Sequence, residues 1–174
     1  MGMEIGNVNV MLKNQECAEE FLKIMDKVLR DSQESYCNRY ESIEELKEEI
    51  EYDEGDPFEM TFDIWGLFDA PSDNGMENVV KEFVQLFPND DINVMLYWSW
   101  DNCGDSATHT ITYSAETRTL HVKEAAYDSF YDDDDNDSDD EENDDWDDED
   151  KEKTIRDDEY KYINDKFEFV TSHV

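Results

Sequence analysis

Basic residues are scarce in this chain. Its 174 residues include only 14 Lys and Arg against 50 Asp and Glu, which gives a formal net charge of −36 at pH 7. Nucleic acids and anionic membrane surfaces repel such a protein, so we expect neither as a direct partner. A charge of this size also weakens the compact state through self-repulsion, and it usually serves solubility or the attraction of a cationic partner. The scarcity of bases therefore favours a basic protein as the partner.

Cysteine and long apolar runs are also scarce. The three Cys residues show no CxxC spacing and have no nearby pair of His, which predicts reduced thiols rather than a disulfide framework or a zinc site. No apolar run approaches the roughly 20 residues needed to span a bilayer, and Met1 to Leu12 lacks the basic start of a signal peptide. We therefore expect a cytoplasmic protein.

Sequence motifs of catalysis are missing. The chain contains no P-loop, GxGxxG, HExxH or nucleophile elbow. The acid-rich run of residues 132–150 has no glycine, which excludes an EF-hand calcium loop. Strand alternation places His109 inward and His121 on the opposite face, so the two do not form a pair. Carboxylate pairs are too frequent for any one of them to indicate acid–base catalysis. These absences predict a protein that is not an enzyme and holds no cofactor and no metal.

What the chain does have is one stretch of extreme acidity, residues 132–150, which we call the acidic tract. Fifteen of its nineteen residues are carboxylates, and Trp146 is its one large apolar residue. Such a segment cannot bury enough apolar surface to offset its ordering entropy. The remaining residues still include 35 acids against 14 bases, so the acidity extends over the whole chain.

Hydropathy patterns predict one α+β domain at residues 1–131. Alternating apolar residues predict five strands, at Ile5 to Leu12, Phe58 to Ile64, Ile92 to Trp100, Ala107 to Tyr113 and Thr119 to Ala125. Apolar residues three and four apart predict three helices, at Gln15 to Arg30, Ser42 to Glu51 and Met76 to Phe87. The order βα(α)βαβββ favours helices on one face of a mixed, mostly antiparallel sheet of ferredoxin-like type.

The C-terminal segment, residues 151–174, is rich enough in aromatic residues to dock back on this domain. Ile155, Tyr160 and Ile163 recur at roughly helical spacing, whereas Phe167 and Phe169 suit a strand, so a helix and a strand both remain open. In either case we expect the acidic tract to be a loop attached at both ends.

One part of the chain resembles a known family. The helix ending in Phe87-Pro88, the strand Ile92 to Trp100 and the hairpin ending in Leu120-His121-Val122 resemble the YubB-like ferredoxin-fold proteins of phages and plasmids. The resemblance covers about half of the chain. It implies an origin in a mobile genetic element and no established catalytic residues.

A second acidic group lies on the predicted helix at Ser42. Between Glu41 and Asp56, nine carboxylates accompany a single base, Lys47, whereas solvated helix faces usually mix the two signs. The acids of such a helix follow each other at about 2.7 Å and those of an extended tract at about 4.3 Å. These values bracket the spacing of about 3.4 Å between the phosphates of one DNA strand.

The charge geometry therefore predicts a nucleic-acid mimic. It would be an inhibitor of anti-CRISPR or anti-restriction type that occupies the basic DNA- or RNA-binding groove of a host defence protein. The predicted partner-binding residues are Asp132, Asp133, Asp134, Asp135, Asp137, Asp139, Asp140, Glu141, Glu142, Asp144, Asp145, Trp146, Asp147, Asp148, Glu44, Glu45, Glu48, Glu49 and Glu51.

Two alternatives remain open. The first is an immunity-type protein that neutralises a basic partner, such as a nuclease toxin, through specific surface contacts. The second is an acidic domain whose tract is only a solubilising linker.

Overall fold

The computed structural model describes residues 4–31, 42–65, 75–100, 106–127 and 152–174. They form an α+β fold with one eight-stranded sheet in the order β2-β3-β1-β4-β5-β6-β7-β8. The strands are β1 (Glu4–Leu12), β2 (Glu51–Asp53), β3 (Phe58–Trp65), β4 (Ile92–Trp100), β5 (Ser106–Ser114), β6 (Thr119–Tyr127), β7 (Glu152–Ile163) and β8 (Lys166–Ser172). The helices are α1 (Gln15–Asp31), α2 (Ile43–Glu49) and α3 (Gly75–Leu86).

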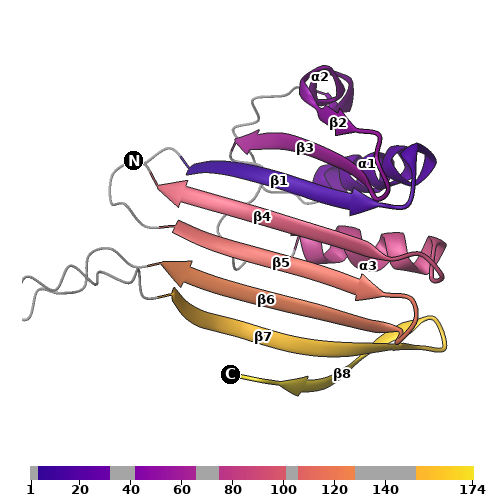
Figure 1. Cartoon of the computed structure of the whole chain (residues 1–174), viewed down its shortest axis with the longest axis vertical. Helices are drawn as coiled ribbons and strands as arrows, with labels where there is room; N and C mark the ends of the chain where they lie inside the picture. Colours follow the sequence, from indigo (N-terminus) through magenta and orange to yellow (C-terminus); the bar gives the residue numbers. More distant parts are fainter. Residues whose placement is uncertain (1–3, 32–41, 66–74, 101–105, 128–151) are drawn as a thin grey trace, which may run out of the picture.

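The helices leave one face of the sheet open. In Figure 1, α1 and α3 lie behind the sheet, and α2 lies beside the edge formed by β2. The face turned toward the viewer, which we call the open face, carries no helix of the described segments. No helix among these segments has the length and apolar character to span a membrane.

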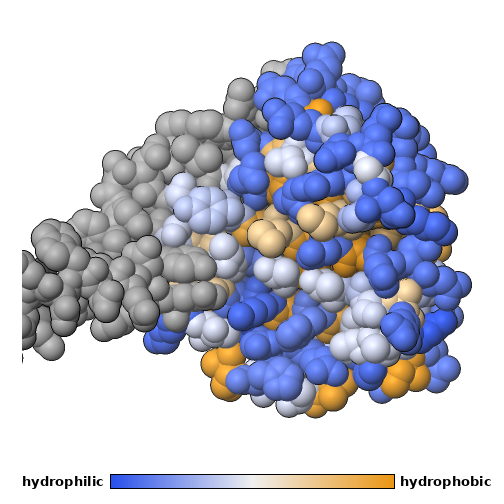
Figure 2. Space-filling view, in the orientation of Figure 1, coloured by the Kyte–Doolittle hydropathy of each residue, from blue (hydrophilic) through white to orange (hydrophobic). Residues whose placement is uncertain are grey.

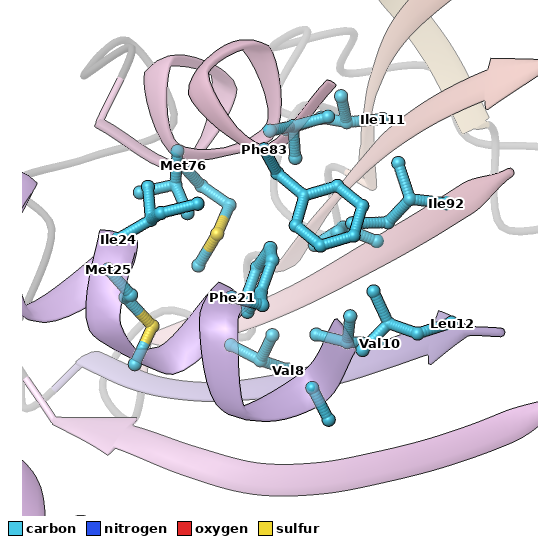
Figure 3. Close-up of a cluster of buried hydrophobic side chains, with 14 of the residues drawn as sticks. Val8, Val10, Leu12, Phe21, Ile24, Met25, Met76, Phe83, Ile92 and Ile111 are labelled. Atoms are coloured by element: carbon cyan, nitrogen blue, oxygen red, sulfur yellow. The ribbon is translucent and has the colours of Figure 1, made fainter. Parts of the chain in front are cut away.

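The hydrophobic core lies between the sheet and the two long helices (Figure 3). Phe21 of α1 and Phe83 of α3 are fully buried and meet edge to face, with ring centroids 6.0 Å apart. Beneath them lie inward residues of β1 such as Val8 and Val10, also fully buried. The apolar spacing of three and four along each helix and of two along each strand places these side chains in one layer.

The five predicted strands and three predicted helices are present, and the α+β class with a mostly antiparallel sheet is confirmed. Two details of the prediction need correction. All described pairings are antiparallel, so the sheet is not mixed. The sheet also has eight strands instead of five, because β2, β7 and β8 extend it, and its order is not clearly that of a ferredoxin-like fold.

The second helix is shorter than the sequence predicted. It ends at Glu49, and Ile50 has an extended backbone with φ −73° and ψ 128°. Glu51 then pairs with Thr61 of β3. Backbone pairing to a neighbouring strand replaces the last helical turn, and local spacing gave no sign of this.

The C-terminal segment adds a hairpin to the sheet, so the strand alternative is the right one. β7 pairs with β6, and β8 pairs with β7. Asn164 and Asp165 join the two strands with φ values of 50° and 60°. Two central residues with positive φ form the type I′ turn that suits the twist of a hairpin, and Asn and Asp tolerate this conformation.

Candidate interaction surfaces

The first candidate surface is an acidic ridge at the β2 edge of the sheet. We use this name for eight exposed carboxylates of α2, β2 and the following turn: Glu44, Glu45, Glu48, Glu49, Glu51, Asp53, Glu54 and Asp56. Lys47 is the one basic residue between positions 42 and 56, and its Nζ lies 3.5 Å from Glu44 Oε1. Single-sign charge is therefore concentrated on one short piece of chain.

Packing fixes the direction of the ridge. Leu46 and Ile50 are 2% and 8% exposed and bind α2 to the domain, so the glutamates at neighbouring positions face outward. Ser42 caps the helix, because its side chain accepts a hydrogen bond from the Glu45 N–H at 3.4 Å. Ser42 followed three positions later by Glu45 is the sequence pattern of a capping box, which predicts this cap, and the structure confirms that Ser42 caps the helix.

An exposed aromatic residue, Tyr52, lies within the ridge. Its side chain is 46% exposed, and its ring packs against Phe58 with the centroids 5.8 Å apart. Partial burial and then the nearby Glu19 carboxylate raise the pKa of Tyr52, so the phenol keeps its proton at neutral pH. Tyrosine is enriched at protein interfaces, which makes Tyr52 a candidate contact residue that the sequence reading missed. The sequence signal for this role is the position of Tyr52 between two acids, Glu51 and Asp53.

The second candidate surface is the middle of the open face, which is neutral. Along β1, β4 and β5, the outward residues with described side chains are all uncharged. They are Asn7, Asn9, Met11, Asn93, Met95, Tyr97, Ser99, Ser106, Thr108, Thr110, Thr112 and Ser114. Figure 2 shows this face, where pale patches lie between blue margins. In a chain with 50 acidic residues, three adjacent strands without an outward charge are a departure from the average surface.

Charged side chains border this neutral area and are bonded within the sheet. On β3, Asp63 accepts a hydrogen bond from Asn7 at 3.0 Å, and Glu59 accepts one from Asn9. On the other side, Asp157 of β7 contacts His121 of β6. Lys123 of β6 and Lys161 of β7 also face outward there, so the border is acidic on the β3 side and mixes both signs on the β6 and β7 side.

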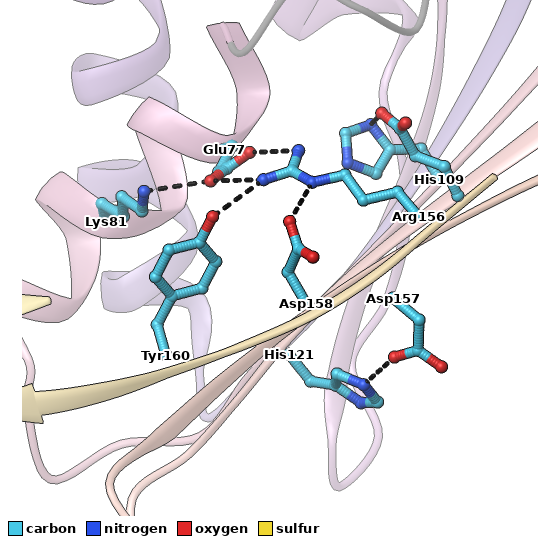
Figure 4. A network of polar contacts seen from close by, with 9 residues as sticks. Glu77, Lys81, His109, His121, Arg156, Asp157, Asp158 and Tyr160 are labelled. Carbon is cyan, nitrogen blue, oxygen red and sulfur yellow. Dashed lines mark hydrogen bonds and ion pairs between the residues drawn. The ribbon is translucent and has the colours of Figure 1, made fainter. Parts of the chain in front are cut away.

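A third group of polar residues lies on the covered face, between α3 and β7 (Figure 4). Arg156 contacts Glu77 at 2.9 and 3.3 Å and Asp158 at 2.6 Å, and Lys81 lies 2.9 Å from Glu77. Burial alone would raise the pKa of Glu77, but the hydrogen bonds and charges of Arg156 and Lys81 outweigh it and lower that pKa. Each of these charged groups has a partner, so the network fixes α3 to β7 and shows no poised acid or base.

His109 is buried beside this network. Its Nδ1 lies 3.6 Å from Glu124 Oε1, and its Nε2 has no hydrogen-bond partner among the described residues. Burial is the main cause that lowers the pKa of His109 to about 4, so the ring is neutral at physiological pH. The alternation that predicted His109 inward and His121 outward is confirmed, since His121 lies exposed on the open face.

An open hollow of about 600 Å³ lies at one end of β1, β4 and β5. Asp90 in its wall lies 3.4 Å from the Lys13 ammonium, and Asp91 accepts a hydrogen bond from the Ala115 N–H at 2.7 Å. The nearby Cys17 thiol is buried, and burial and then Asp90 raise its pKa, so it is a packed, protonated thiol. The described residues contain no group of three or more His, Cys, Asp or Glu that could hold a metal ion.

The predicted partner-binding residues fall into two sets. Those from Glu44 to Glu51 belong to the acidic ridge and are exposed. Those of the acidic tract, Asp132 to Asp148, lie outside the described residues, as do Cys37 and Cys103. The strands on either side of the tract pair with each other, with Tyr127 opposite Glu152. Because β2 is the first strand of the sheet and β6 the sixth, these ends lie roughly 24 Å across the sheet from the ridge.

No protein-family model, no curated protein and no solved structure matches this chain.

Proposed function

We propose that this chain is an inhibitor that places exposed carboxylates in the basic nucleic-acid-binding groove of a host defence protein. The observation that carries the proposal is the acidic ridge, with eight exposed carboxylates and one lysine on a single edge of the fold. A surface that only keeps a protein soluble mixes both signs, because interspersed charges gain from pairing. The ridge offers a cationic groove many acceptors at once.

The spacing of the helical carboxylates supports this reading. Glu44 and Glu48, like Glu45 and Glu49, are one helical turn apart, which is about 6 Å along the axis. The two rows are adjacent, so their carboxylates follow on average at about 3 Å, close to the phosphate spacing of about 3.4 Å along a DNA strand. Arg and Lys placed to hold successive phosphates would therefore find acceptors at similar intervals.

The acidic tract extends the proposal to a second contact. Residues 128–151 connect the end of β6 to the start of β7. A loop of this length, extended out and back, can reach about 40 Å from its attachment points. That reach exceeds the roughly 24 Å between its attachment points and the ridge. One basic partner could thus meet both acidic groups.

The resemblance to YubB-like proteins belongs to the same proposal. The helix, strand and hairpin on which it rests correspond to α3, β4, β5 and β6. This order supports a ferredoxin-like type for that part of the sheet and an origin in a phage or plasmid, with action in the host cytoplasm.

The test is capture of partners from host lysate at about 50 mM and about 500 mM salt, with duplex DNA as competitor and identification by mass spectrometry. We expect the captured proteins to bind nucleic acid, and both salt and DNA to release them. For each captured protein, a variant with Glu44, Glu45, Glu48 and Glu49 changed to Gln should lose at least tenfold in affinity. Binding that is indifferent to salt, or not displaced by DNA, contradicts the proposal.

A matched variant controls for total charge. Changing Glu16, Glu20, Glu82 and Glu116 to Gln removes the same number of charges from other parts of the surface. This variant should keep most of the affinity. An equal loss of affinity in both variants would mean that only the net charge matters, as expected if the acidity serves solubility alone.

The neutral open face favours a second candidate, an immunity-type protein that binds one basic partner through specific contacts. Met95 and Tyr97 are 46% and 45% exposed there, and such side chains serve as interface anchors. In that case Tyr97→Lys should abolish binding. Neutralising the whole tract with Asn and Gln at constant length should then leave much of the binding intact, whereas a mimic should lose most of it.

A further inference from the structure

The two edges of the sheet differ in how they are protected. The β2 edge has a strand of three residues with two acids, Glu51 and Asp53, and it lies beside α2. The other edge is β8, Lys166–Ser172, which has seven residues, and no further described strand pairs with it. Natural sheets usually shorten, charge or cover their edges, because an open edge pairs with other strands. β8 is interrupted by a bulge at Val170, where its register to β7 shifts, but it is the longer of the two edge strands.

Exposed apolar side chains gather at the same edge. Of the nine large hydrophobic residues that are exposed in the described segments, five lie on β7, on β8 or at the end of the chain: Ile155, Ile163, Phe169, Val170 and Val174. Phe169 and Val170 at the middle of β8 are 59% and 49% exposed. On the covered side of the sheet, Phe169 packs edge to face against Tyr160 at 5.7 Å, which leaves much of its ring open to solvent.

The charge of β8 differs from that of the chain as a whole. The strand KFEFVTS contains one base, Lys166, and one acid, Glu168, so its formal charge is zero in a protein of −36. A cationic partner is drawn to the acidic ridge and has no electrostatic reason to choose β8. A neutral apolar strand edge fits another neutral apolar strand edge, and a second copy of the chain supplies one of equal length.

We propose that the chain forms a dimer in which β8 pairs antiparallel with β8 of a second copy and joins the two sheets into one. A two-fold axis through Phe169 sets this residue opposite Phe169 of the other copy, and the bulge at Val170 interrupts the regular ladder beside it. In this arrangement Val170 lies near Glu168 of the other copy. The two Phe169 rings then cover each other, and the free backbone groups of both edges gain partners.

This dimer must form against the repulsion of two strongly acidic bodies, which gives it a salt dependence of known sign. Added salt screens that repulsion, so dimerisation should strengthen as salt rises. Capture of a basic partner by the acidic ridge should weaken over the same range. The two processes therefore separate in one titration, and failure of one leaves the other intact.

The experiment is sedimentation equilibrium of the full chain at about 50, 150 and 500 mM salt. We expect a monomer of 20.6 kDa that converts to a dimer with rising concentration, with at least tenfold tighter association at the highest salt than at the lowest. A monomer at every salt concentration up to about 0.5 mM protein overturns the proposal. Dimerisation that weakens with salt overturns it as well.

Two substitutions at one position test the register. Val170→Glu places a carboxylate near Glu168 of the other copy twice and should weaken the dimer more than tenfold, whereas Val170→Lys should preserve it. Gln15→Glu adds the same charge at the exposed start of α1, far from β8, and should have little effect. If Val170→Glu dimerises like the natural chain, the interface lies elsewhere and the proposal is wrong. The salt series on the natural chain decides the matter even if one variant fails to fold.

Discussion

Arg156 of β7 binds both carboxylate oxygens of Glu77 on α3, a residue 79 positions earlier in the chain. Its Nη1 lies 2.9 Å from Oε2 and its Nη2 3.3 Å from Oε1 (Figure 4). The Glu77 side chain is 3% exposed, so this carboxylate depends on its protein partners for solvation. The contact joins the C-terminal hairpin to the helical layer. We infer that it helps to fix the register of β7, which is a role that buried ion pairs serve in other folds.

Arg156→Met should destabilise the fold by about 3 kcal/mol, since it leaves a buried carboxylate with Lys81 as its remaining cation. Urea unfolding followed by circular dichroism measures this loss. Lys153→Met, an exposed position on the same strand, is the matched control and should change stability by less than about 0.5 kcal/mol. Replacing Glu77 by Leu in the Arg156→Met background should recover part of the loss. If the double variant were as unstable as the single one, the buried charge would not be the cause.

His109 should make stability depend on pH between about 6.5 and 4. Burial, opposed by Glu77 and assisted by Arg156, lowers the pKa of His109 to about 4, whereas the unfolded chain has the ordinary value near 6.5. The unfolded state therefore binds the proton first. The contribution of His109 to the free energy of unfolding is complete above about pH 6.5. It is lost as the pH falls toward about 4, by up to about 3 kcal/mol.

His109→Gln removes this titration, so the variant should show a smaller fall in unfolding free energy from pH 6.5 to 4.5. Glu124 is buried beside His109, and burial raises its pKa, which contributes a slope of the opposite sign in both proteins. The difference between the two proteins thus isolates His109. His173→Gln, at an exposed position, should behave like the natural chain. Equal slopes in all three proteins would show that His109 is not protected from protonation.

Tyr113→Phe should cost about 1 kcal/mol, because the Tyr113 hydroxyl donates a hydrogen bond to the Pro88 carbonyl at 2.9 Å and the side chain is 1% exposed. The same change at Tyr97, which is 45% exposed on the open face, should leave stability unchanged. Thermal unfolding of the two variants provides the comparison. A similar loss in both would mean that the buried hydrogen bond contributes nothing specific.

Ser42→Ala should destabilise α2 by about 0.5 kcal/mol, the low end for loss of an N-cap, since the bond to the Glu45 N–H is long at 3.4 Å. Ser42→Asp should restore stability, because Asp is also a strong N-cap and its charge favours a helix start. Hydrogen exchange of the α2 amides measures the local effect. Faster exchange in the Asp variant as well would exclude capping as the cause.

Some elements followed directly from the sequence because their signals are local. The strand over Ile92–Trp100 and the helix from Gln15 were predicted at or near their observed bounds, since alternation and helical spacing depend on neighbouring residues alone. The hairpin turn at Asn164 and Asp165 was also visible as a turn-forming pair. Ile155, Tyr160 and Ile163 nevertheless also fit a helical spacing, so the sequence leaves a helix and a strand both open.

The sequence by itself determined the alternation that buries His109 and exposes His121, the cap at Ser42 and the one-sided charge of the residues around α2. Only the tertiary structure decided the strand order, the neutral middle of the open face and the contact between Glu77 and Arg156. The physical reason is that pairing between distant strands depends on the sum of many weak contacts over the whole sheet, whereas spacing along the chain reports only which side each residue faces. A carboxylate that finds its guanidinium 79 residues away leaves no mark in either local sequence.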